Sequence, residues 1–485
     1  MAFRLLLALI LASTVVAVAG CASRPVNTSI VDVNRNAGYR FGTRLQNDDD
    51  KETMIVLAFS GGGTRAAAFS FGVLEELRRT EIEARDGSRK RLLDSVDVIT
   101  GVSGGSFTAL AYGLYGDKLF DEYEKRFLKR DIQGELLARF LNPKNWASLW
   151  STGWGRSEMA AALYDEVLFN GATFSDLDLR TGPLIIATAT DISTGSRFSF
   201  LQTEFDLLCS NLESVSLSRA AAASSAVPLV LSPVTLNNYG GNCGNTPPKW
   251  VQLLTSPYNK VRPAGRAVQR LKEMNNFQDS KNRPFIHLVD GGLADNLGMR
   301  AVLETLEELE AIRATGATTR LDSVRRLVVF VVNSLSIPKT KWDQSESPPD
   351  SIAILWKATG VPIDRYSYEA VELLKDIVAR WKTMRELREA GLFAQGNGVK
   401  MAALGNVPEI DVYPIDVSFS GLKDEAEFDY LNDLPTSFVL PDEAVDRLRA
   451  AAGTIIVQSP EFARLLKDLR ARAMAAPATQ KAAAP

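Results

Sequence analysis

Residues 96–106 read VDVITGVSGGS, and a G-x-S-x-G motif runs from Gly101 to Gly105 between an apolar segment and a helical pattern. A serine at such a strand-to-helix turn is held in strained geometry, and its neighbours must lack side chains to avoid clashes. The turn also points the N-terminus of the helix at the serine, which favours developing negative charge there. This context makes Ser103 a candidate nucleophile and Gly101, Gly104 and Gly105 its supporting residues.

Apolar segments that suit buried strands alternate along the chain with helical patterns, the first of them at 64–79. Continuous apolar runs bounded by glycines are typical of buried parallel strands. The alternation predicts an α/β fold with a mostly parallel central sheet flanked by helices. The strand candidates are 54–59, 96–100, 184–190, 285–289 and 327–332.

A second turn between a strand and a helix, residues 59–65, reads FSGGGTR. Consecutive glycines leave backbone N–H groups free to point at an anion, and the following helix adds its dipole. We therefore expect Gly61, Gly62 and Gly63 to form an oxyanion hole. Arg65 either binds a lipid phosphate or fixes the glycine loop, and a buried structural ion pair is the alternative to both roles.

Two other interpretations of the glycine loop stay open. The loop can be a closely packed turn that binds nothing. Gly61, Gly63 and Ala66 also satisfy the G-x-G-x-x-A fingerprint of dinucleotide-binding proteins, which requires a second strand ending in an acidic residue about twenty positions later. Residues 83–91 form a polar, charged segment instead, which disfavours dinucleotide binding.

The stretch Asp290-Gly291-Gly292 follows another strand candidate. An aspartate at the C-terminal end of a parallel strand lies at the edge where α/β active sites are built, and glycines beside it permit close approach of another loop. His287, the one histidine of the chain, precedes Asp290 by three positions, so on a strand the two side chains point to opposite faces. If Asp290 faces the serine, His287 does not, which favours a Ser-Asp dyad. A triad of the serine with Asp191 and His287 is the competing arrangement.

Together, G-G-G-x-R, G-x-S-x-G and D-G-G in this order resemble the patatin-like phospholipase family over about residues 54–335. Residues 222–228, AASSAVP, resemble its alanine-rich helix, and residues 189–195, ATDISTG, resemble one of its strand ends. Ala66 departs from the family, which often has glycine there. The resemblance implies a patatin-like three-layer fold, lipid or phospholipid substrates, and a serine ester hydrolase of the phospholipase A or carboxylesterase type without a cofactor.

The implied mechanism is acyl transfer. Asp290 accepts the proton of Ser103 as the serine attacks an ester carbonyl, the glycine loop holds the oxyanion, and water releases the acyl-enzyme. A transacylase would use the same residues with another alcohol in place of water. A lipoprotein with a degenerate site would only bind lipid. Both alternatives stay open.

The first twenty residues resemble the signal peptide of a bacterial lipoprotein. Arg4 supplies a positive charge, residues 5–18 are apolar but short for a membrane span, and VAGC follows at residues 18–21. Small residues before a cysteine resemble a lipobox, so we expect Cys21 to be lipidated and to attach the chain to a membrane. An ordinary signal peptide with an incidental cysteine is the alternative. The expected location is a bacterial cell envelope, at the outer membrane or the periplasmic face if the cell is Gram-negative.

The composition, 46% hydrophobic and 23% charged over 485 residues, is that of an ordinary globular protein. The net charge of −3 argues against a nucleic-acid-binding protein, because no basic surplus exists to neutralise phosphates. Cysteine and histidine do not cluster with metal-ligand spacing, so we expect no metal. The sequence indicates no obligate protein partner. Cys209 and Cys243 form either a disulfide or two buried thiols.

A tryptophan-rich segment and the polar regions complete the organisation. Trp146, Trp150 and Trp154 form either a lid or lipid-contacting patch, because tryptophan favours membrane interfaces, or part of the core. In the C-terminal region, long helical patterns bracket a strand-like segment at 409–419. The expected parts are a signal peptide at 1–20, a polar tether at 21–51, a catalytic domain at 52–335 and a mainly helical extension at 336–485 that packs on this domain. Within the extension, the helical patterns lie at 364–390 and 443–473, and we expect the last ~10 residues to be disordered.

Overall fold

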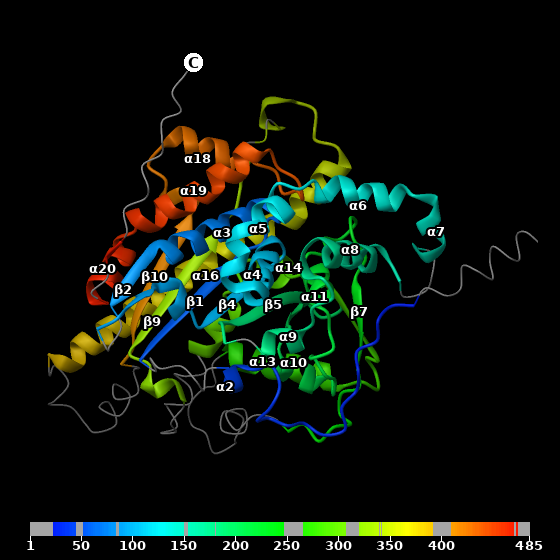
Figure 1. Cartoon of the computed structure of the whole chain (residues 1–485), viewed down its shortest axis with the longest axis horizontal. Coiled ribbons are helices and arrows are strands. Elements are labelled where there is room, and N and C mark those ends of the chain that lie inside the picture. Colours follow the sequence, from blue (N-terminus) through cyan, green and yellow to red (C-terminus); the bar gives the residue numbers. More distant parts are fainter. Residues whose placement is uncertain are drawn as a thin grey trace, which may run out of the picture.

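The computed structural model has a large sheet at its centre, with strand order β10-β9-β1-β4-β5-β8-β7 (Figure 1). The strands from β10 to β5 pair in parallel, whereas β8 pairs antiparallel with both β5 and β7, and β6 pairs antiparallel with β5. The predicted mostly parallel sheet is therefore confirmed. Its strands are β1 (Thr53–Phe59), β4 (Val98–Val102), β5 (Leu184–Asp191), β6 (Ser196–Ser199), β7 (Val234–Asn237), β8 (Phe285–Asp290), β9 (Arg326–Asn333) and β10 (Asp411–Ser418). A small second sheet joins β2 (Thr80–Glu83), β3 (Arg89–Arg91) and β11 (Arg472–Ala473).

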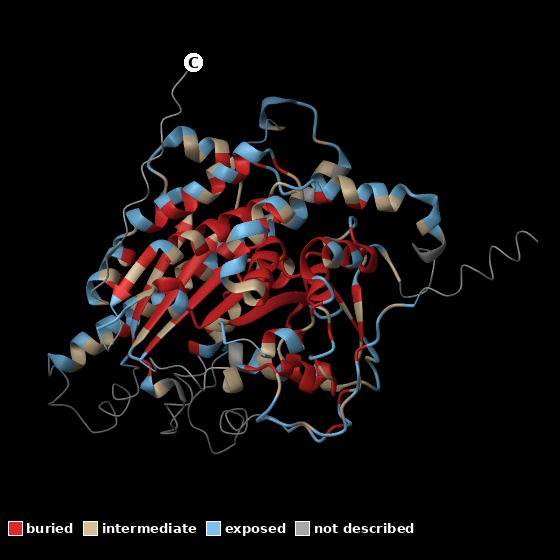
Figure 2. Ribbon diagram, viewed as in Figure 1, coloured by how far each residue is buried: buried red, intermediate tan, exposed pale blue. Residues whose placement is uncertain are grey.

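Helices flank the central sheet, as the sequence predicted. Buried residues concentrate in the strands and in the helices that lie against them, while the outer helices are mostly exposed (Figure 2).

The structure describes residues 23–44, 52–83, 87–149, 154–179, 181–246, 265–306, 320–338, 340, 342–390, 409–469 and 472–473. The helices used below are α3 (Gly63–Arg79), α4 (Gly104–Tyr115), α6 (Ile132–Leu141), α7 (Pro143–Leu149), α8 (Arg156–Tyr164), α11 (Leu217–Ser224), α14 (Gly292–Asp295), α16 (Ser351–Glu389), α18 (Glu425–Asn432), α19 (Asp442–Gln458) and α20 (Pro460–Asp468). The other described α-helices are α2 (Phe41–Arg44), α5 (Leu119–Tyr123), α9 (Phe174–Asp178), α10 (Gln202–Leu207) and α13 (Gly265–Gln278).

Two strands differ from the sequence-based expectation. β4 begins at Val98, two residues later than predicted. Asp97 precedes it and still contacts β1: its N–H donates to the Ile55 carbonyl at 3.0 Å, and its carboxylate accepts from the Ile55 N–H at 2.7 Å. β8 is antiparallel to β5, so the prediction that Asp290 ends a parallel strand is wrong. The ladder still places Asp290 opposite Ala189, and Val102 opposite Thr188. Ser103 and Asp290 therefore arrive at the same level on either side of β5.

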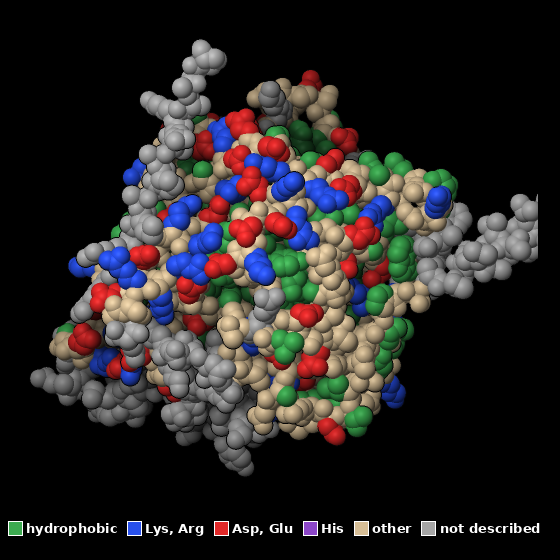
Figure 3. Space-filling view, in the orientation of Figure 1, with side chains coloured by type: hydrophobic (Ala, Val, Ile, Leu, Met, Phe, Trp, Pro, Cys, Tyr) green, Lys and Arg blue, Asp and Glu red, His purple; other side chains and the backbone are tan. Residues whose placement is uncertain are grey.

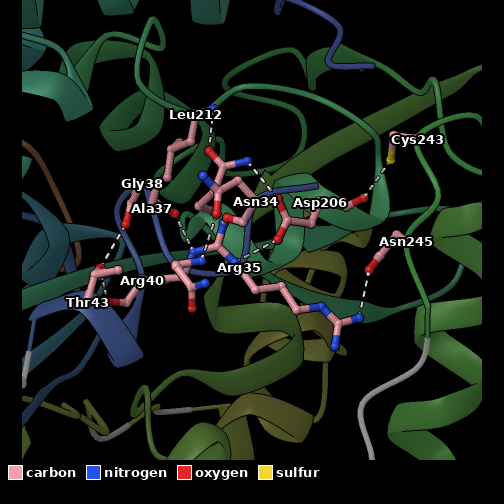
Figure 4. A network of polar contacts seen from close by, with 12 residues as sticks. Asn34, Arg35, Ala37, Gly38, Arg40, Thr43, Asp206, Leu212, Cys243 and Asn245 are labelled. Carbon is pink, nitrogen blue, oxygen red and sulfur yellow. Dashed lines mark hydrogen bonds and ion pairs between the residues drawn. The ribbon is translucent and has the colours of Figure 1, made fainter. Parts of the chain in front are cut away.

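The segment predicted as a polar tether packs against the catalytic domain over residues 23–44. Tyr39 is fully buried and its hydroxyl accepts a hydrogen bond from the Ile185 N–H at 2.7 Å. Arg40 forms a buried ion pair with Asp206 at 2.8 Å, within the polar network of Figure 4. The tether prediction is thus wrong for this stretch, because buried aromatic and charged groups hold it in place. The signal peptide and the lipidation site lie outside the described residues.

A disulfide joins Cys209 to Cys243 and decides between the two alternatives left open for these cysteines. The N-terminal segment lies beside it, because the Ile30 N–H donates to the Cys209 carbonyl at 2.8 Å. An isolated bridge between Ser29 and Ser210 extends the contact. The disulfide therefore lies where the N-terminal segment meets the domain.

The C-terminal region contributes to the central sheet. β10 confirms the strand-like segment and pairs along its whole length with β9, while α19 packs along α3. The helix predicted from residue 364 begins earlier, as α16, and continues through Pro362. The second predicted helix is divided into α19 and α20, because Ser459 caps α20 and a proline occupies its first position. Among the described residues, none of the helices combines the length and apolar character that crossing a bilayer requires.

Candidate active site

Ser103 lies at the sharp turn between β4 and α4. Its φ of 48° falls in the left-handed region, which is strained for a residue with a side chain. Hydrogen bonds on both sides hold the turn: the Ser103 N–H donates to the Ser224 hydroxyl at 2.8 Å, and the Ser103 carbonyl accepts from the Ser106 N–H at 3.0 Å and from its hydroxyl at 2.6 Å. A Cβ at Gly104 would lie 2.0 Å from the Gly63 carbonyl oxygen. The G-x-S-x-G turn therefore packs directly against the glycine loop.

The partner of Ser103 is Asp290. The serine hydroxyl donates to Oδ2 of Asp290 at 2.8 Å, and Oδ1 accepts from the Gly292 N–H at 2.8 Å. The backbone of the aspartate is fixed by α11 and the residues after it, since the Asp290 N–H donates to the Ala226 carbonyl at 3.0 Å. Both carboxylate oxygens thus have defined positions. Close backbone contacts, under 3.0 Å for an added Cβ, also surround Gly101, Gly105 and Gly291.

The electrostatic environment prepares Asp290 to accept a proton. Burial raises the pKa of Asp290 to about 6, against the opposing effect of the hydrogen bonds from the Gly292 N–H and the Ser103 hydroxyl. A carboxylate of this pKa is still ionised at neutral pH and is a stronger base than an exposed aspartate. Tyr164, the last residue of α8, is fully buried, and its pKa is raised by burial and by the charge of Asp290.

The glycine loop connects β1 to α3 beside the serine. Gly62 and Gly63 have φ values of 139° and 62°, which only glycine adopts readily. The Gly61 N–H donates to the Asn296 carbonyl at 2.9 Å, so Gly61 lacks the free donor predicted for it. No residue in the described parts of the chain accepts a hydrogen bond from the N–H of Gly62 or Gly63. These two groups, at the N-terminus of α3, are available to an oxyanion.

A family model described as patatin-like phospholipase matches residues 57–303, a span that holds Ser103, Asp290, the glycine loop and the whole of α3. The chain belongs to the patatin-like phospholipase family. The dinucleotide-binding alternative is set aside, because the matched span includes Gly61, Gly63 and Ala66.

Solved structures similar to this patatin-like chain include human GIVD cytosolic phospholipase A2, with 13% identity and a TM-score of 0.40, covering 87% of this chain and 63% of that one. The human protein in complex with methyl gamma-linolenyl fluorophosphonate is also similar, with 14% identity, a TM-score of 0.39, and coverage of 87% and 60%. The chain therefore spans less than two thirds of the length of these solved chains. No curated protein sequence matches it.

Arg65 of the patatin-like domain is buried beneath the glycine loop. Its guanidinium donates to the Ser334 carbonyl and the Leu434 carbonyl, each at 2.7 Å, and to the Thr436 hydroxyl at 3.1 Å. Burial lowers the pKa of Arg65 to about 10, while the charge of Asp364 raises it. With its donors directed at two backbone carbonyl groups and a hydroxyl, Arg65 is placed to fix the loop. The alternative, a buried ion pair, is not formed with any carboxylate among the described residues.

The competing triad is not assembled in the patatin-like domain. Asp191 is fully buried in an ion pair with Arg283 and accepts hydrogen bonds from the Ser193 N–H at 3.2 Å and the Thr194 hydroxyl at 2.7 Å. His287 hydrogen-bonds through Nδ1 to the Thr235 hydroxyl at 3.0 Å on the neighbouring strand. Neither side chain is directed to the serine, whose hydroxyl donates to Asp290.

Several residues that shape the patatin-like site have no signal in the sequence. Asn296 accepts from Gly61, and the Ser437 carbonyl accepts from the Thr64 N–H at 2.8 Å at the start of α3. Ser224 lies within the alanine-rich stretch noted in the sequence, but its role as acceptor for the Ser103 N–H could be found only from the structure. The C-terminal extension, in which the sequence indicates no chemistry, thus helps to hold the glycine loop.

Proposed function

We propose that this chain hydrolyses acyl esters of membrane lipids, with Ser103 as the nucleophile and Asp290 as the only base. The observation that carries the proposal is the 2.8 Å hydrogen bond from the serine hydroxyl to Oδ2 of Asp290, made at a strained turn beside two free glycine N–H groups. The family assignment supports a lipid as substrate. The positions of His287 and Asp191 argue against a triad.

Acylation follows from this geometry. Asp290 takes the hydroxyl proton as Ser103 Oγ forms a bond to the ester carbonyl carbon. The N–H groups of Gly62, Gly63 and Gly104 stabilise the oxyanion, and the N-termini of α3 and α4 add their dipoles. When the intermediate collapses, the ester C–O bond breaks and the departing alcohol takes the proton from Asp290. The acyl group stays on the serine.

Deacylation uses the same groups in reverse. A water molecule gives a proton to Asp290 and attacks the acyl carbon, and the oxyanion returns to the same N–H groups. Collapse releases the fatty acid, and Asp290 returns the proton to Ser103. A transacylase would admit an alcohol in place of this water, so acyl transfer to an added alcohol acceptor, measured against hydrolysis, separates the two activities. The completeness of the site argues against a degenerate, purely lipid-binding role.

We also propose that Cys21 carries the lipid that attaches the chain to a bacterial envelope membrane. The support is the apolar run followed by VAGC at residues 18–21. Cys21→Ser should move the protein from the membrane fraction to the soluble fraction. If the wild type and Cys21→Ser divide between the membrane and soluble fractions in the same proportions, Cys21 is not the anchor and this part of the proposal is wrong.

The deciding experiment compares four purified proteins on p-nitrophenyl esters, phospholipids and lysophospholipids. Ser103→Ala and Asp290→Asn should each lose at least about a thousandfold in turnover, because the two residues act as one unit. His287→Ala should keep most of its turnover, because His287 contacts Thr235 rather than the serine. A folded His287→Ala protein that loses turnover while Asp290→Asn retains it would overturn the dyad.

A further inference from the structure

An exposed apolar loop follows the residues that hold the catalytic pair. Ser224 and Ala226 bind the backbone of Ser103 and Asp290, and the chain then leads to Leu229, whose side chain is 61% exposed. Leu229 has a φ of 73°, a region that a leucine occupies only at an energetic cost. Val230 beside it is also exposed. A strained backbone that presents apolar side chains to solvent next to a reaction site indicates a contact surface.

A second group of exposed apolar side chains lies on α6 and α7. Leu137 and Leu141 are one helical turn apart on α6, and Trp146 follows on α7; all three are exposed. The chain after α7 returns to the 227–233 loop, because the Ser157 N–H at the start of α8 donates to the Ser232 hydroxyl at 3.1 Å. We call Leu137, Leu141, Trp146, Leu229 and Val230 the apolar rim. Figure 3 shows hydrophobic side chains over α6 and along the edge of the molecule beside β7.

The N-terminal segment reaches the same corner of the molecule. Arg24 donates to the Thr235 carbonyl at 3.0 Å, and Arg219 of α11 donates to the same oxygen at 2.8 Å. Arg219 in turn forms a buried ion pair at 2.9 Å with Glu158, in the first turn of α8. The described chain begins at residue 23, and Cys21 lies two residues earlier, within about 7 Å of extended chain. A lipid on Cys21 would hold this corner at the membrane.

We propose that the apolar rim inserts into the phospholipid bilayer and presents lipid from that bilayer to Ser103. This inference rests on the proposed function, because it uses Cys21 as the lipid anchor and Ser103 as the nucleophile. Three observations select a bilayer. The rim comes from separate elements around the site, it includes a tryptophan, which favours the membrane interface, and its Leu229 and Val230 lead into β7, where the N-terminal segment binds through Arg24. Ser103 is itself buried, so a substrate reaches it from a surface that borders the site.

The test measures vesicle binding by a chain that can neither be lipidated nor hydrolyse lipid. Full-length protein carrying Cys21→Ser and Ser103→Ala is sedimented with vesicles of phosphatidylethanolamine and phosphatidylglycerol at rising lipid concentration. Adding Leu229→Asn and Val230→Asn should lower the partition coefficient about tenfold. Asparagine suits the backbone of residue 229, so the fold should be kept, and thermal unfolding checks this. The matched control is Leu179→Asn, which should change nothing. It alters a leucine that is 83% exposed and precedes the N-terminal end of β5, whereas Ser103 lies toward the other end of that strand.

The outcomes are distinct. A parent chain that does not bind vesicles, a rim variant that binds as the parent does, or a control that weakens binding equally would each overturn the membrane rim. Because the readout is binding by a protein without the Ser103 hydroxyl, it does not depend on hydrolysis. A wild type that hydrolyses no lipid would defeat the proposed function and leave the binding result unchanged.

Discussion

Replacing Asp290 by asparagine should raise the folding stability of the protein at neutral pH while it removes the catalytic base. In the folded chain, burial raises the pKa of this carboxyl from 3.8 to about 6. The folded state therefore holds the proton more tightly than the unfolded state does. As the pH rises from about 4 to 6, the unfolded chain has released this proton and the folded chain has not, so the stability of the wild type falls.

The magnitude follows from the shift. Between 3.8 and about 6 the pKa changes by about 2 units, and at about 1.4 kcal/mol a unit this amounts to roughly 3 kcal/mol. Asparagine keeps a carbonyl for the Gly292 N–H and an amide beside the Ser103 hydroxyl, but it carries no charge. Asp290→Asn should thus be more stable than the wild type by up to about 3 kcal/mol above pH 6, and about equal to it below pH 4.

Urea unfolding of both proteins between pH 4 and 8, with the disulfide intact, measures the difference directly. The free energies of unfolding should diverge as the pH rises and reach a plateau near pH 7. An asparagine variant that is less stable than the wild type at pH 8 would refute the reasoning. A difference that does not vary with pH would refute it as well, because the effect would then not come from the buried charge.

Three further predictions concern the base, the glycine loop and the disulfide. The kcat/KM for a soluble ester should fall tenfold per pH unit below about 6, as the catalytic aspartate takes up its proton; an inflection near pH 4 would contradict its burial. Gly63→Ala should cost about 2–3 kcal/mol of stability and abolish ester hydrolysis, because the new Cβ would lie 2.2 Å from a backbone oxygen of the C-terminal segment. The control Gly116→Ala, at a similar φ of 54° with open space around it, should cost about 1 kcal/mol, and equal losses would refute the steric argument. Removing both Cys209 and Cys243 should lower the free energy of unfolding by about 3–4 kcal/mol, since the disulfide joins residues 34 positions apart in the sequence. An unchanged midpoint of urea unfolding would contradict this.

Local patterns in the sequence were sufficient to predict the chemistry-bearing turns. The glycines around Ser103 are required by contacts within a few ångströms, so the motif carries its own structural reason. The same is true of Gly62 and Gly63, whose positive φ values favour glycine. The three-position offset between His287 and Asp290 also correctly separated their side chains, because strand geometry is local.

What the sequence did not reveal depends on long-range contacts. The direction of β8 is set by its neighbour β5, so an apolar run alone could not show that Asp290 arrives from an antiparallel strand. The Gly61 N–H is taken by Asn296, and Arg65 is held by a carbonyl 369 positions away at Leu434. Polar composition likewise suggested a tether before residue 52, whereas single buried residues such as Tyr39 fix that segment on the domain.

Covalent trapping tests the central claim most directly. The wild type and the His287→Ala, Asp290→Asn and Ser103→Ala variants are treated with an alkyl fluorophosphonate, and the modified peptides are identified by mass spectrometry. A Ser-Asp dyad predicts one adduct per chain, on Ser103. The adduct should form at similar rates in the wild type and in His287→Ala, and at a greatly reduced rate in Asp290→Asn. No adduct should form in Ser103→Ala. An adduct on another residue of the wild type, or a His287→Ala protein that is folded but not labelled, would contradict the account.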